Sequence, residues 1–295
     1  MVTGAGGLIG GCAAKALHEK GYEVAGIYRQ LGSGEANLPW KAIQCDLLRE
    51  EAPRRLNEID FDSVVHCAAV LPSQLSGKEA QQAALANRTM DDRIVDLCLH
   101  GGYSLIYTST VSVYGLQIDA IATEEGNPRP IGEYASAKAA SEAKMLTALA
   151  GTVILRISSP YGPGQRIRNV LRVFIEQALS GLDLVYHGNG NRRQDFISAC
   201  DVGNAVACSV SRIKSNEVFN IASGNPISMR DLAELVVRTV PGTGSRIIPS
   251  GIPDPQEDYR AAFSIRKAET LLGWRPLISL TDGIRNLAQY LKEKN

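Results

Sequence analysis

The sequence lacks an excess of charge, a long apolar run and a paired set of cysteines. Its 31 lysines and arginines balance its 31 aspartates and glutamates, which argues against a broad nucleic-acid footprint or an anionic-membrane surface. No apolar run reaches the roughly 18 residues that span a membrane, and no secretory signal is visible. We therefore predict a cytoplasmic protein that binds neither nucleic acid nor membrane.

The six cysteines do not have the short paired spacing of metal or redox sites. Most of them lie in apolar stretches, where cysteine behaves as a small hydrophobic residue. This pattern predicts buried, reduced thiols and no bound metal, and it fits the cytoplasm.

Short apolar runs alternate with helical stretches in the first half of the chain. Strands are expected at residues 22–28, 42–45, 63–68, 104–108 and 153–157, and helices at 8–20, 49–58, 78–100 and 132–149. Such alternation indicates a parallel sheet covered on both faces by helices. We predict an α/β fold, with a Rossmann-type doubly wound parallel sheet over residues 1–159.

Prolines and glycines at 160–164 interrupt this rhythm. Beyond them, helices are expected at residues 170–180, 201–211, 230–239, 265–272 and 282–294, and short strands at 184–186, 195–197, 218–221 and 246–248. We predict that residues 160–295 form mainly a smaller C-terminal α/β substrate lobe, with some segments crossing back to the first lobe.

Only Met1, Val2 and Thr3 precede the first glycine, where a central strand is expected. A central half-strand should cost stability, so we expect the native chain to have a few residues before Met1.

Three glycines, Gly4, Gly7 and Gly10, fall where that strand would turn into a helix, with Leu8 and Ile9 between them. Glycines at such a place permit a tight turn and let backbone N–H groups approach a pyrophosphate at the positive helix end. The motif predicts a bound dinucleotide cofactor; the alternative is a glycine-rich turn with no ligand.

The tip of the second strand reads Tyr28-Arg29-Gln30, without the carboxylate that NAD enzymes usually place there. Arg29 could pair with a ribose 2′-phosphate, which favours NADP over NAD; the alternative is a solvated loop arginine. After the third strand, Asp46 and Leu47 are assigned to the adenine end of the cofactor. Asp46 is equally compatible with a turn-forming role.

The fourth strand ends in small residues. Ala68 and Ala69 would let the backbone pass under the cofactor, whereas His66 is expected to be a packed strand-end residue. Asn87 has poor propensity for the long helix in which it lies, so it either bonds backbone or a water, or is merely tolerated. Thr108, near the end of the fifth strand, is assigned to the same cofactor site.

Tyr134 and Lys138 are four residues apart, which places them on one face of a helix. A neighbouring ammonium favours ionisation of a phenol, so we expect the pKa of Tyr134 to lie below its ordinary value near 10. Tyr134 is then a candidate acid/base group. Thr110 is its candidate hydroxyl partner, with Ser109 and Ser112 as rivals.

Together these motifs resemble the extended short-chain dehydrogenase/reductase family, in particular its NAD-dependent epimerase/dehydratase group, which acts mainly on nucleotide sugars. The resemblance covers almost the whole chain. It rests on the Thr-Gly-x-x-Gly-x-x-Gly opening and on residues 66–69, 109–115, 134–138, 155–156, 161–164, 195–197, 201–202, 219–224 and 272–276.

The resemblance implies that Tyr134 is the acid/base and that Lys138 binds the nicotinamide ribose and lowers the tyrosine pKa. It implies that Thr110 is the hydroxyl partner, and that hydride passes between the nicotinamide and a sugar carbon. It also implies a homodimer formed through the helices at 78–100 and 132–149.

Departures from the family pattern reduce the number of activities to be expected. Val111 and Ser112 stand where family dehydratases commonly carry an Asp-Glu pair, so dehydration is not expected. Gln194 replaces an arginine that clamps the diphosphate in many members. Arg192, Arg193 and Arg260 are the remaining candidates for that contact, and Ser109, Thr110 and Tyr134 for the sugar.

We therefore expect a nucleotide-sugar epimerase or a 4-ketosugar reductase. The alternative, suggested by the missing arginines, is an NADP-dependent reductase or dehydrogenase of a carbonyl compound without a nucleotide. A non-catalytic dinucleotide sensor or RNA-associated relative is a third reading, against which the retained Tyr134, Lys138 and Thr110 argue.

Overall fold

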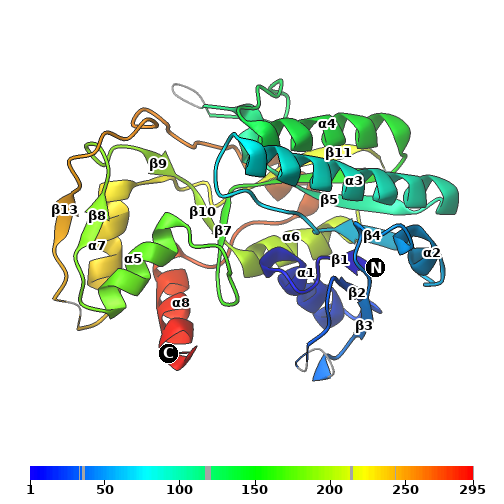
Figure 1. The fold of residues 1–295 in the computed structure, drawn as a ribbon, viewed down its shortest axis with the longest axis horizontal. Coiled ribbons are helices and arrows are strands. Elements are labelled where there is room, and N and C mark those ends of the chain that lie inside the picture. Colours follow the sequence, from blue (N-terminus) through cyan, green and yellow to red (C-terminus); the bar gives the residue numbers. More distant parts are fainter. Residues whose placement is uncertain (33, 35–36, 117–120, 213–214, 243, 295) are drawn as a thin grey trace.

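The computed structural model describes residues 1–294 except 33, 35–36, 117–120, 213–214 and 243. A large sheet with helices on both faces fills one side of the molecule, and a smaller group of helices and short strands fills the other (Figure 1). No helix in the described part of the chain combines the length and apolar content needed to cross a membrane.

The large sheet has seven strands, all parallel, in the order β11-β6-β5-β4-β1-β2-β3. The strands are β1 (Val2–Thr3), β2 (Ala25–Tyr28), β3 (Lys41–Gln44), β4 (Ser63–His66), β5 (Ser104–Thr110), β6 (Thr152–Ile157) and β11 (Glu217–Ile221). The strand order reverses between β1 and β4, which is the switch point at which doubly wound sheets bind ligands. The predicted α/β fold class is confirmed.

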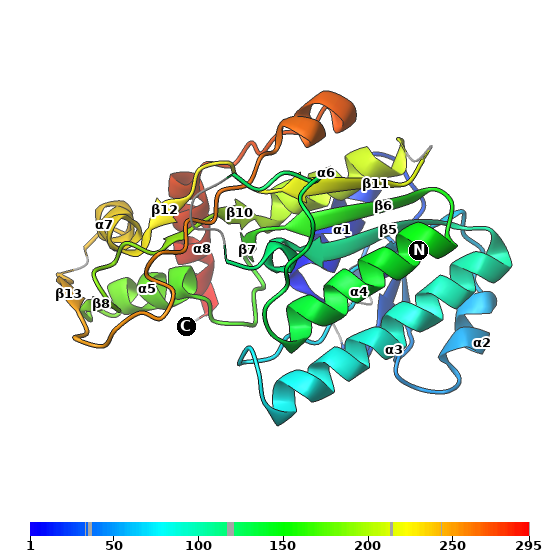
Figure 2. The same ribbon diagram turned by 90° about the horizontal axis from the view of Figure 1, so that it is seen from above.

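Helices cover both faces of this sheet. One face is covered by α1 (Leu8–Glu19) and α6 (Ala199–Val210), and the other by α2 (Ala52–Asn57), α3 (Lys78–Gly101) and α4 (Glu133–Ala148). Seen from above, α3 and α4 run side by side along the outer face (Figure 2). α1 packs so closely on α6 that a Cβ on Gly203 would lie 2.5 Å from the Cys12 carbonyl oxygen.

The central strand β1 is only two residues long, yet it pairs with neighbours on both sides. Val2 pairs with Gly26 of β2 and Val65 of β4. Met1 extends the contact, because its carbonyl accepts a hydrogen bond from the Val65 N–H at 2.8 Å. The strand therefore takes the central position that the sequence predicts.

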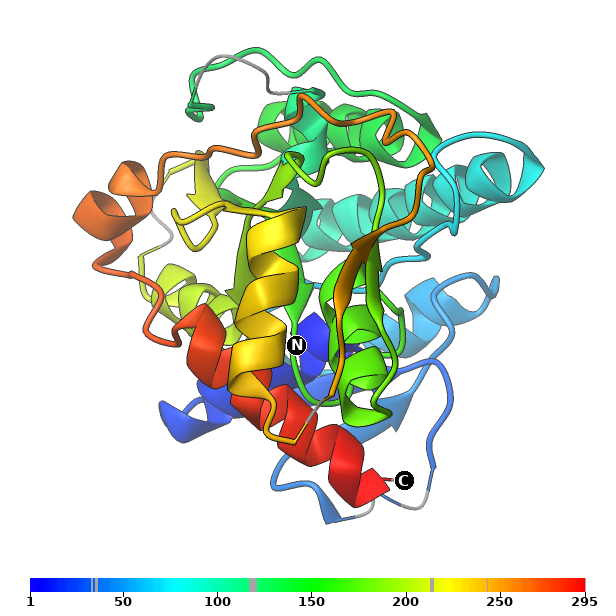
Figure 3. The same ribbon diagram turned by 90° about the vertical axis from the view of Figure 1, so that its left-hand side faces the viewer.

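The smaller part of the molecule has its own apolar core. It is formed by α5 (Val170–Leu179), α7 (Met229–Thr239) and α8 (Leu280–Lys294), which pack on one another (Figure 3, green, yellow and red). Short strand pairs complete it, namely β8 (Leu184–Tyr186) with β13 (Ile247–Pro249), β9 (Arg193–Gln194) with β12 (Ile227–Ser228), and β7 (Ser159–Tyr161) with β10 (Phe196–Ser198). β7, β9 and β12 were not predicted, because two or three residues carry too little periodicity.

Two segments beyond residue 160, α6 and β11, pack with the large sheet. Asp201 of α6 accepts hydrogen bonds from the N–H groups of Leu277 and Ile278, both at 3.0 Å. The Trp274 indole donates to the Asp201 carbonyl oxygen at 3.0 Å. The start of α6 thus holds the segment that leads into α8, while a domain boundary at residue 159 stays a prediction.

Candidate functional site

The glycine turn after β1 lies at the switch point of the sheet. Gly4 has φ of 65°, and a Cβ on it would lie 2.7 Å from the Ala68 amide nitrogen, beyond the end of β4. A Cβ on Gly10 would lie 2.2 Å from the Gly4 carbonyl oxygen, which also accepts a hydrogen bond from the Gly7 N–H at 2.8 Å. Only glycine fits at Gly4 and Gly10, because backbone fills the space of a side chain.

The first turn of α1 presents backbone N–H groups to this switch point. Gly7 is the N-cap residue and makes no side-chain capping bond, and the first turn carries no acidic residue. Leu8 and Ile9 therefore offer N–H donors at the positive end of the helix dipole without an internal anion to satisfy them. A pyrophosphate fits this arrangement.

The adenine end of the predicted cofactor site contains an arginine and a turn. Arg29 is exposed directly after β2. The Asp46 carboxylate accepts a hydrogen bond from the Leu48 N–H at 3.0 Å, and Arg49 lies 3.9 Å away. Leu47 is buried in the core. Of the two readings of Asp46, the turn-forming role is the one visible in the structure.

The segment after β4 is held from both sides. Thr3 accepts hydrogen bonds from the amide N–H groups of Cys67 and Ala68, at 3.1 and 3.3 Å. Asn87 of α3 is buried and bonds both the N–H and the carbonyl of Val70, at 2.7 and 2.8 Å. Asn87 therefore holds backbone, one of the roles considered for it, and Ala69 is left exposed beside it.

The predicted catalytic residues lie on adjacent elements. Tyr134 and Lys138 are on α4, and Thr110 is the last residue of β5. Lys138 is buried and donates to the Thr108 carbonyl at 3.1 Å. Thr110 exchanges hydrogen bonds with Ser112 and caps the short helix that follows. Among the described residues, Thr110 and Tyr134 share no hydrogen bond.

The expected lowering of the Tyr134 pKa is wrong for this structure. Burial raises the pKa of the phenol, and the Asp91 carboxylate raises it further. The Lys138 ammonium points elsewhere, lying 4.2 Å from the centre of the Tyr107 ring. Tyr134 itself is partly buried and accepts no hydrogen bond from a described residue.

Ser109 belongs to a buried ion pair behind the site and not to its open surface. Its hydroxyl donates to Glu142, which also pairs with Arg156 at 2.7 Å. Both charged side chains are almost fully buried, and the Arg156 guanidinium stacks on the Tyr114 ring at 4.8 Å. Removing either charge would leave the other buried and unpaired, at a cost of about 3–5 kcal/mol.

The three arginines assigned to substrate lie in one region of the smaller part. Arg192 forms an ion pair with Asp254 at 2.8 Å, and Arg193 donates to the Pro226 carbonyl at 2.7 Å. Arg260 donates to the Glu257 carbonyl at 3.2 Å. Each of these side chains is therefore bonded to another part of the protein.

Several polar residues at the site were missed by the motif-based reading. Asp91 and Glu142 lie buried on the inner faces of α3 and α4, and Asn220 of β11 accepts from the Tyr114 hydroxyl at 2.7 Å. The sequence did contain a signal for Asp91 and Glu142, because a carboxylate within the apolar stripe of a helix is rare unless it is paired. The spacing of residues along the chain did not show which residues are their partners.

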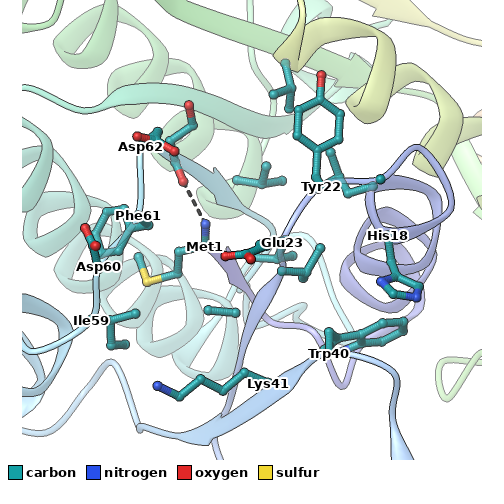
Figure 4. A pocket seen from close by; sticks show the side chains of 18 of the residues that line it. Met1, His18, Tyr22, Glu23, Trp40, Lys41, Ile59, Asp60, Phe61 and Asp62 are labelled. Carbon is teal, nitrogen blue, oxygen red and sulfur yellow. Dashed lines mark hydrogen bonds between the residues drawn. The ribbon is translucent and has the colours of Figure 1, made fainter.

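A pocket of ≈ 790 Å³ opens at the opposite edge of the sheet (Figure 4). It is lined by Met1 and by residues that precede β2, β3 and β4, which places it at the amino ends of the strands. The Met1 amino group donates to the Ser63 carbonyl there at 2.8 Å. Because the glycine turn, Thr110 and Tyr134 lie at the carboxyl ends, this pocket is separate from the candidate site.

A doubly wound sheet with a glycine turn at its switch point defines a dinucleotide-binding α/β protein. The sequence model of the NAD dependent epimerase/dehydratase family matches residues 1–222, and the chain belongs to that family.

Relatives and solved structures agree with this assignment. A putative UDP-glucose 4-epimerase of Methanocaldococcus jannaschii is 27% identical, and the match covers 100% of this chain and 99% of that one. A dTDP-D-glucose 4,6-dehydratase of Mus musculus is 28% identical over 86% of this chain and 74% of its own. The relatives therefore include both epimerases and dehydratases.

Two crystal structures of epimerases superpose on the whole fold. UDP-glucose 4-epimerase of Thermotoga maritima, solved with UDP-glucose, is 25% identical with a TM-score of 0.89, covering 99% of this chain and 98% of that one. UDP-glucuronic acid 4-epimerase of Bacillus cereus, in complex with UDP-glucuronic acid and NAD, is 27% identical with a TM-score of 0.85, covering 100% and 99%.

One cysteine pair departs from the prediction of buried, inert thiols. Cys12 of α1 and Cys200 at the start of α6 are neighbouring thiols, and Cys200 is exposed. The Cys12 thiol lowers the pKa of Cys200 to about 6, against the opposing effect of partial burial. Burial raises the pKa of Cys67 and of Cys98 to about 12.

We expect iodoacetamide to alkylate Cys200 first, because the thiolate is the nucleophile. The rate should be half-maximal near pH 6 in the parent protein. In Cys12→Ala, which lacks the neighbouring thiol, the midpoint should move toward the ordinary thiol value of about 8.5. Mass spectrometry of the tryptic peptides measures both rates, and a midpoint above pH 8 in both proteins would contradict the assignment.

Proposed function

We propose that this protein is a nucleotide-sugar epimerase or 4-ketosugar reductase that uses a nicotinamide dinucleotide, with Tyr134 as its acid/base. One observation carries the proposal. The glycine turn after β1 and the group formed by Thr110, Tyr134 and Lys138 after β5 lie at the same carboxyl edge of a single parallel sheet. Ligands of doubly wound sheets bind along that edge.

The residues at the switch point fit a dinucleotide. The backbone at Gly4 and Gly10 leaves no room for side chains, and Leu8 and Ile9 offer N–H donors in the first turn of α1. When bound, the nicotinamide accepts and returns hydride. The protein supplies placement of the substrate and a route for the hydroxyl proton.

Each of the three polar residues has a distinct role. Lys138 is fixed by the Thr108 carbonyl and would hold the nicotinamide ribose when the cofactor binds. Thr110 presents its hydroxyl at the end of β5. Tyr134, whose hydroxyl is not engaged by a described residue, exchanges a proton with the substrate hydroxyl. A ligand that excludes water there strengthens the effect of the Lys138 charge on the phenol.

The residues after Thr110 argue against dehydration. Expelling a hydroxyl as water requires a group that protonates it. Val111 is buried and apolar, and Ser112 is bonded to Thr110, so neither position supplies a carboxylic acid. We therefore propose epimerisation or reduction, although the relatives include dehydratases.

Substrate recognition rests on the arginines of the smaller part. Arg193 keeps its positive charge while it donates to a carbonyl, and Arg260 is partly exposed. Both can contribute to a diphosphate site. Arg192 is neutralised by Asp254, which favours the second candidate function, an NADP-dependent reductase of a carbonyl compound without a nucleotide. Competition by uridine or thymidine diphosphate separates the two.

Replacing Tyr134 by Phe should leave the fold and cofactor binding intact and lower turnover by about 10²–10⁴-fold, the usual contribution of a general acid/base. Steady-state assays with UDP- and dTDP-sugars, together with thermal melting, measure this. Tyr290→Phe, a change on the remote helix α8, is the matched control. Turnover of Tyr134→Phe at the parent level would remove Tyr134 from the mechanism.

We expect the protein to prefer NADPH to NADH, because Arg29 stands where a 2′-phosphate would lie. Arg29→Ala should weaken NADPH binding by about tenfold or more, as expected for a lost charged hydrogen bond, and should spare NADH. Titration calorimetry after removal of any bound nucleotide measures both constants, with Arg54→Ala on α2 as control. Equal losses for both nucleotides, or stoichiometric NAD⁺ released on denaturing the parent, would contradict the preference.

We further propose a homodimer formed through α3 and α4. Leu85 and Leu99 of α3 are 67% and 51% exposed on the helix that runs beside α4 (Figure 2). We expect Leu85→Glu to convert the dimer into a monomer in sedimentation velocity. Leu277→Glu, at an equally exposed leucine before α8, should not. A monomeric parent protein would end this proposal.

A further inference from the structure

A chain of buried polar side chains runs beneath the candidate site from β1 to α3. The Thr3 hydroxyl lies 2.6 Å from His66 Nδ1, and His66 Nε2 lies 3.0 Å from the Asp91 carboxylate. All three residues are at most 2% exposed. Burying three polar side chains costs free energy unless they are hydrogen-bonded to one another.

The hydrogen bonds of Thr3 determine the tautomer of His66. A hydroxyl oxygen has two lone pairs and one proton. Both lone pairs of Thr3 are used by the N–H groups of Cys67 and Ala68, so its proton must be donated to His66 Nδ1. His66 is then neutral and carries its proton on Nε2, which donates to Asp91.

Asp91 accepts hydrogen bonds from every neighbour. Besides His66, the hydroxyls of Tyr107 and Ser141 each donate to Oδ2 at 2.7 Å. Hydrogen bonds donated to a carboxylate favour its ionised form, so these three contacts favour the charged state of Asp91. The pKa of Asp91 is accordingly lowered, because Lys138, His66 and Ser141 together outweigh the opposing effect of burial.

Lys138 is a buried cation without a direct ion pair. Its ammonium donates to the Thr108 carbonyl and lies over the Tyr107 ring, and the ion pairs of the described residues place no carboxylate within 4.0 Å of it. Burial lowers the pKa of Lys138, against the charges of Asp91, Cys67 and Glu142. A cation in this position needs a counter-charge to stay protonated.

Of those three groups, Asp91 is the one that can act as the counter-charge of Lys138. Glu142 is neutralised by Arg156 at 2.7 Å. Cys67 is a neutral thiol, because burial raises its pKa to about 12. The Tyr107 hydroxyl donates to Asp91, and the Lys138 ammonium lies over the ring of the same tyrosine.

We propose that Asp91 is a positioning residue that supplies the fixed negative charge keeping Lys138 protonated beside Tyr134, and that Thr3 and His66 hold its carboxylate in place. This inference rests on the proposed function for its consequence in turnover. The negative charge of Asp91 acts on both groups of the α4 pair, because a carboxylate favours the protonated form of an ammonium and of a phenol alike.

Removing that charge should move the titrations of Lys138 and Tyr134 in the same direction. In Asp91→Asn both pKa values should fall. The acid dissociation constant of the Lys138 ammonium should rise about tenfold, the effect expected when one nearby charge is removed. The acidic and alkaline limbs of kcat should then both move to lower pH. A purely structural role would lower kcat or stability without displacing the profile.

Asp92→Asn is the matched control. Asp92 is the next residue on α3, but it is exposed and pairs with Lys144 at the surface. Ser141→Ala removes one hydrogen bond from Asp91 and leaves its charge, so it should lower stability without moving either limb.

The first measurement is the titration of the Lys138 side chain by NMR with ¹³Cε-labelled lysine, assigned with Lys138→Met. A midpoint that falls in Asp91→Asn and stays unchanged in Asp92→Asn supports the inference; equal midpoints overturn it. This readout needs no substrate, so a fall in midpoint in a protein inactive on every nucleotide sugar would reject the proposed function and support the Asp91 assignment.

If Asp91→Asn does not fold, the parent protein alone decides. The inference requires that Lys138 remain protonated throughout neutral pH, to about pH 8, despite its burial. A midpoint above that value supports it, and a midpoint below it overturns it.

Discussion

The site depends on how closely the chain passes itself between the carboxyl ends of β1 and β4. Gly4 touches the backbone at Ala68, and Gly10 touches Gly4. A side chain at either glycine would push α1 away from the sheet. The first turn of α1 is therefore positioned by backbone contact, so the proposed dinucleotide site depends on the packing of the two central strands.

Behind the site, buried charged side chains lie beside β5: Glu142 forms an ion pair with Arg156, and Asp91 and Lys138 both contact Tyr107. Tyr107 and Ser109 lie on the same face of this strand because side chains alternate. Tyr107 stands between Asp91 and Lys138, and Ser109 donates to Glu142. Buried charges are tolerated only when their partners are in place. The register of α3, α4 and β5 is thus fixed by electrostatics as well as by apolar packing.

Two buried carboxylates, Asp195 and Asp201, connect separate segments of the chain. Asp195 accepts hydrogen bonds from the Ser158 hydroxyl and from the N–H and hydroxyl of Ser223, at 2.7 to 2.8 Å. Asp201 holds the segment that leads into α8. These contacts join the smaller part of the molecule to the large sheet.

The sequence by itself determined the features that depend on local period: the alternation of strands and helices, the glycines of the turn, and the shared helix face of Tyr134 and Lys138. Only the tertiary structure decided which charges meet. Arg192 pairs with Asp254, 62 residues away. Asp91 raises the pKa of Tyr134, whereas the sequence had predicted that this pKa would be lowered. Hydrogen bonds and desolvation act over a few ångströms in space, and the spacing of residues along the chain does not give those distances.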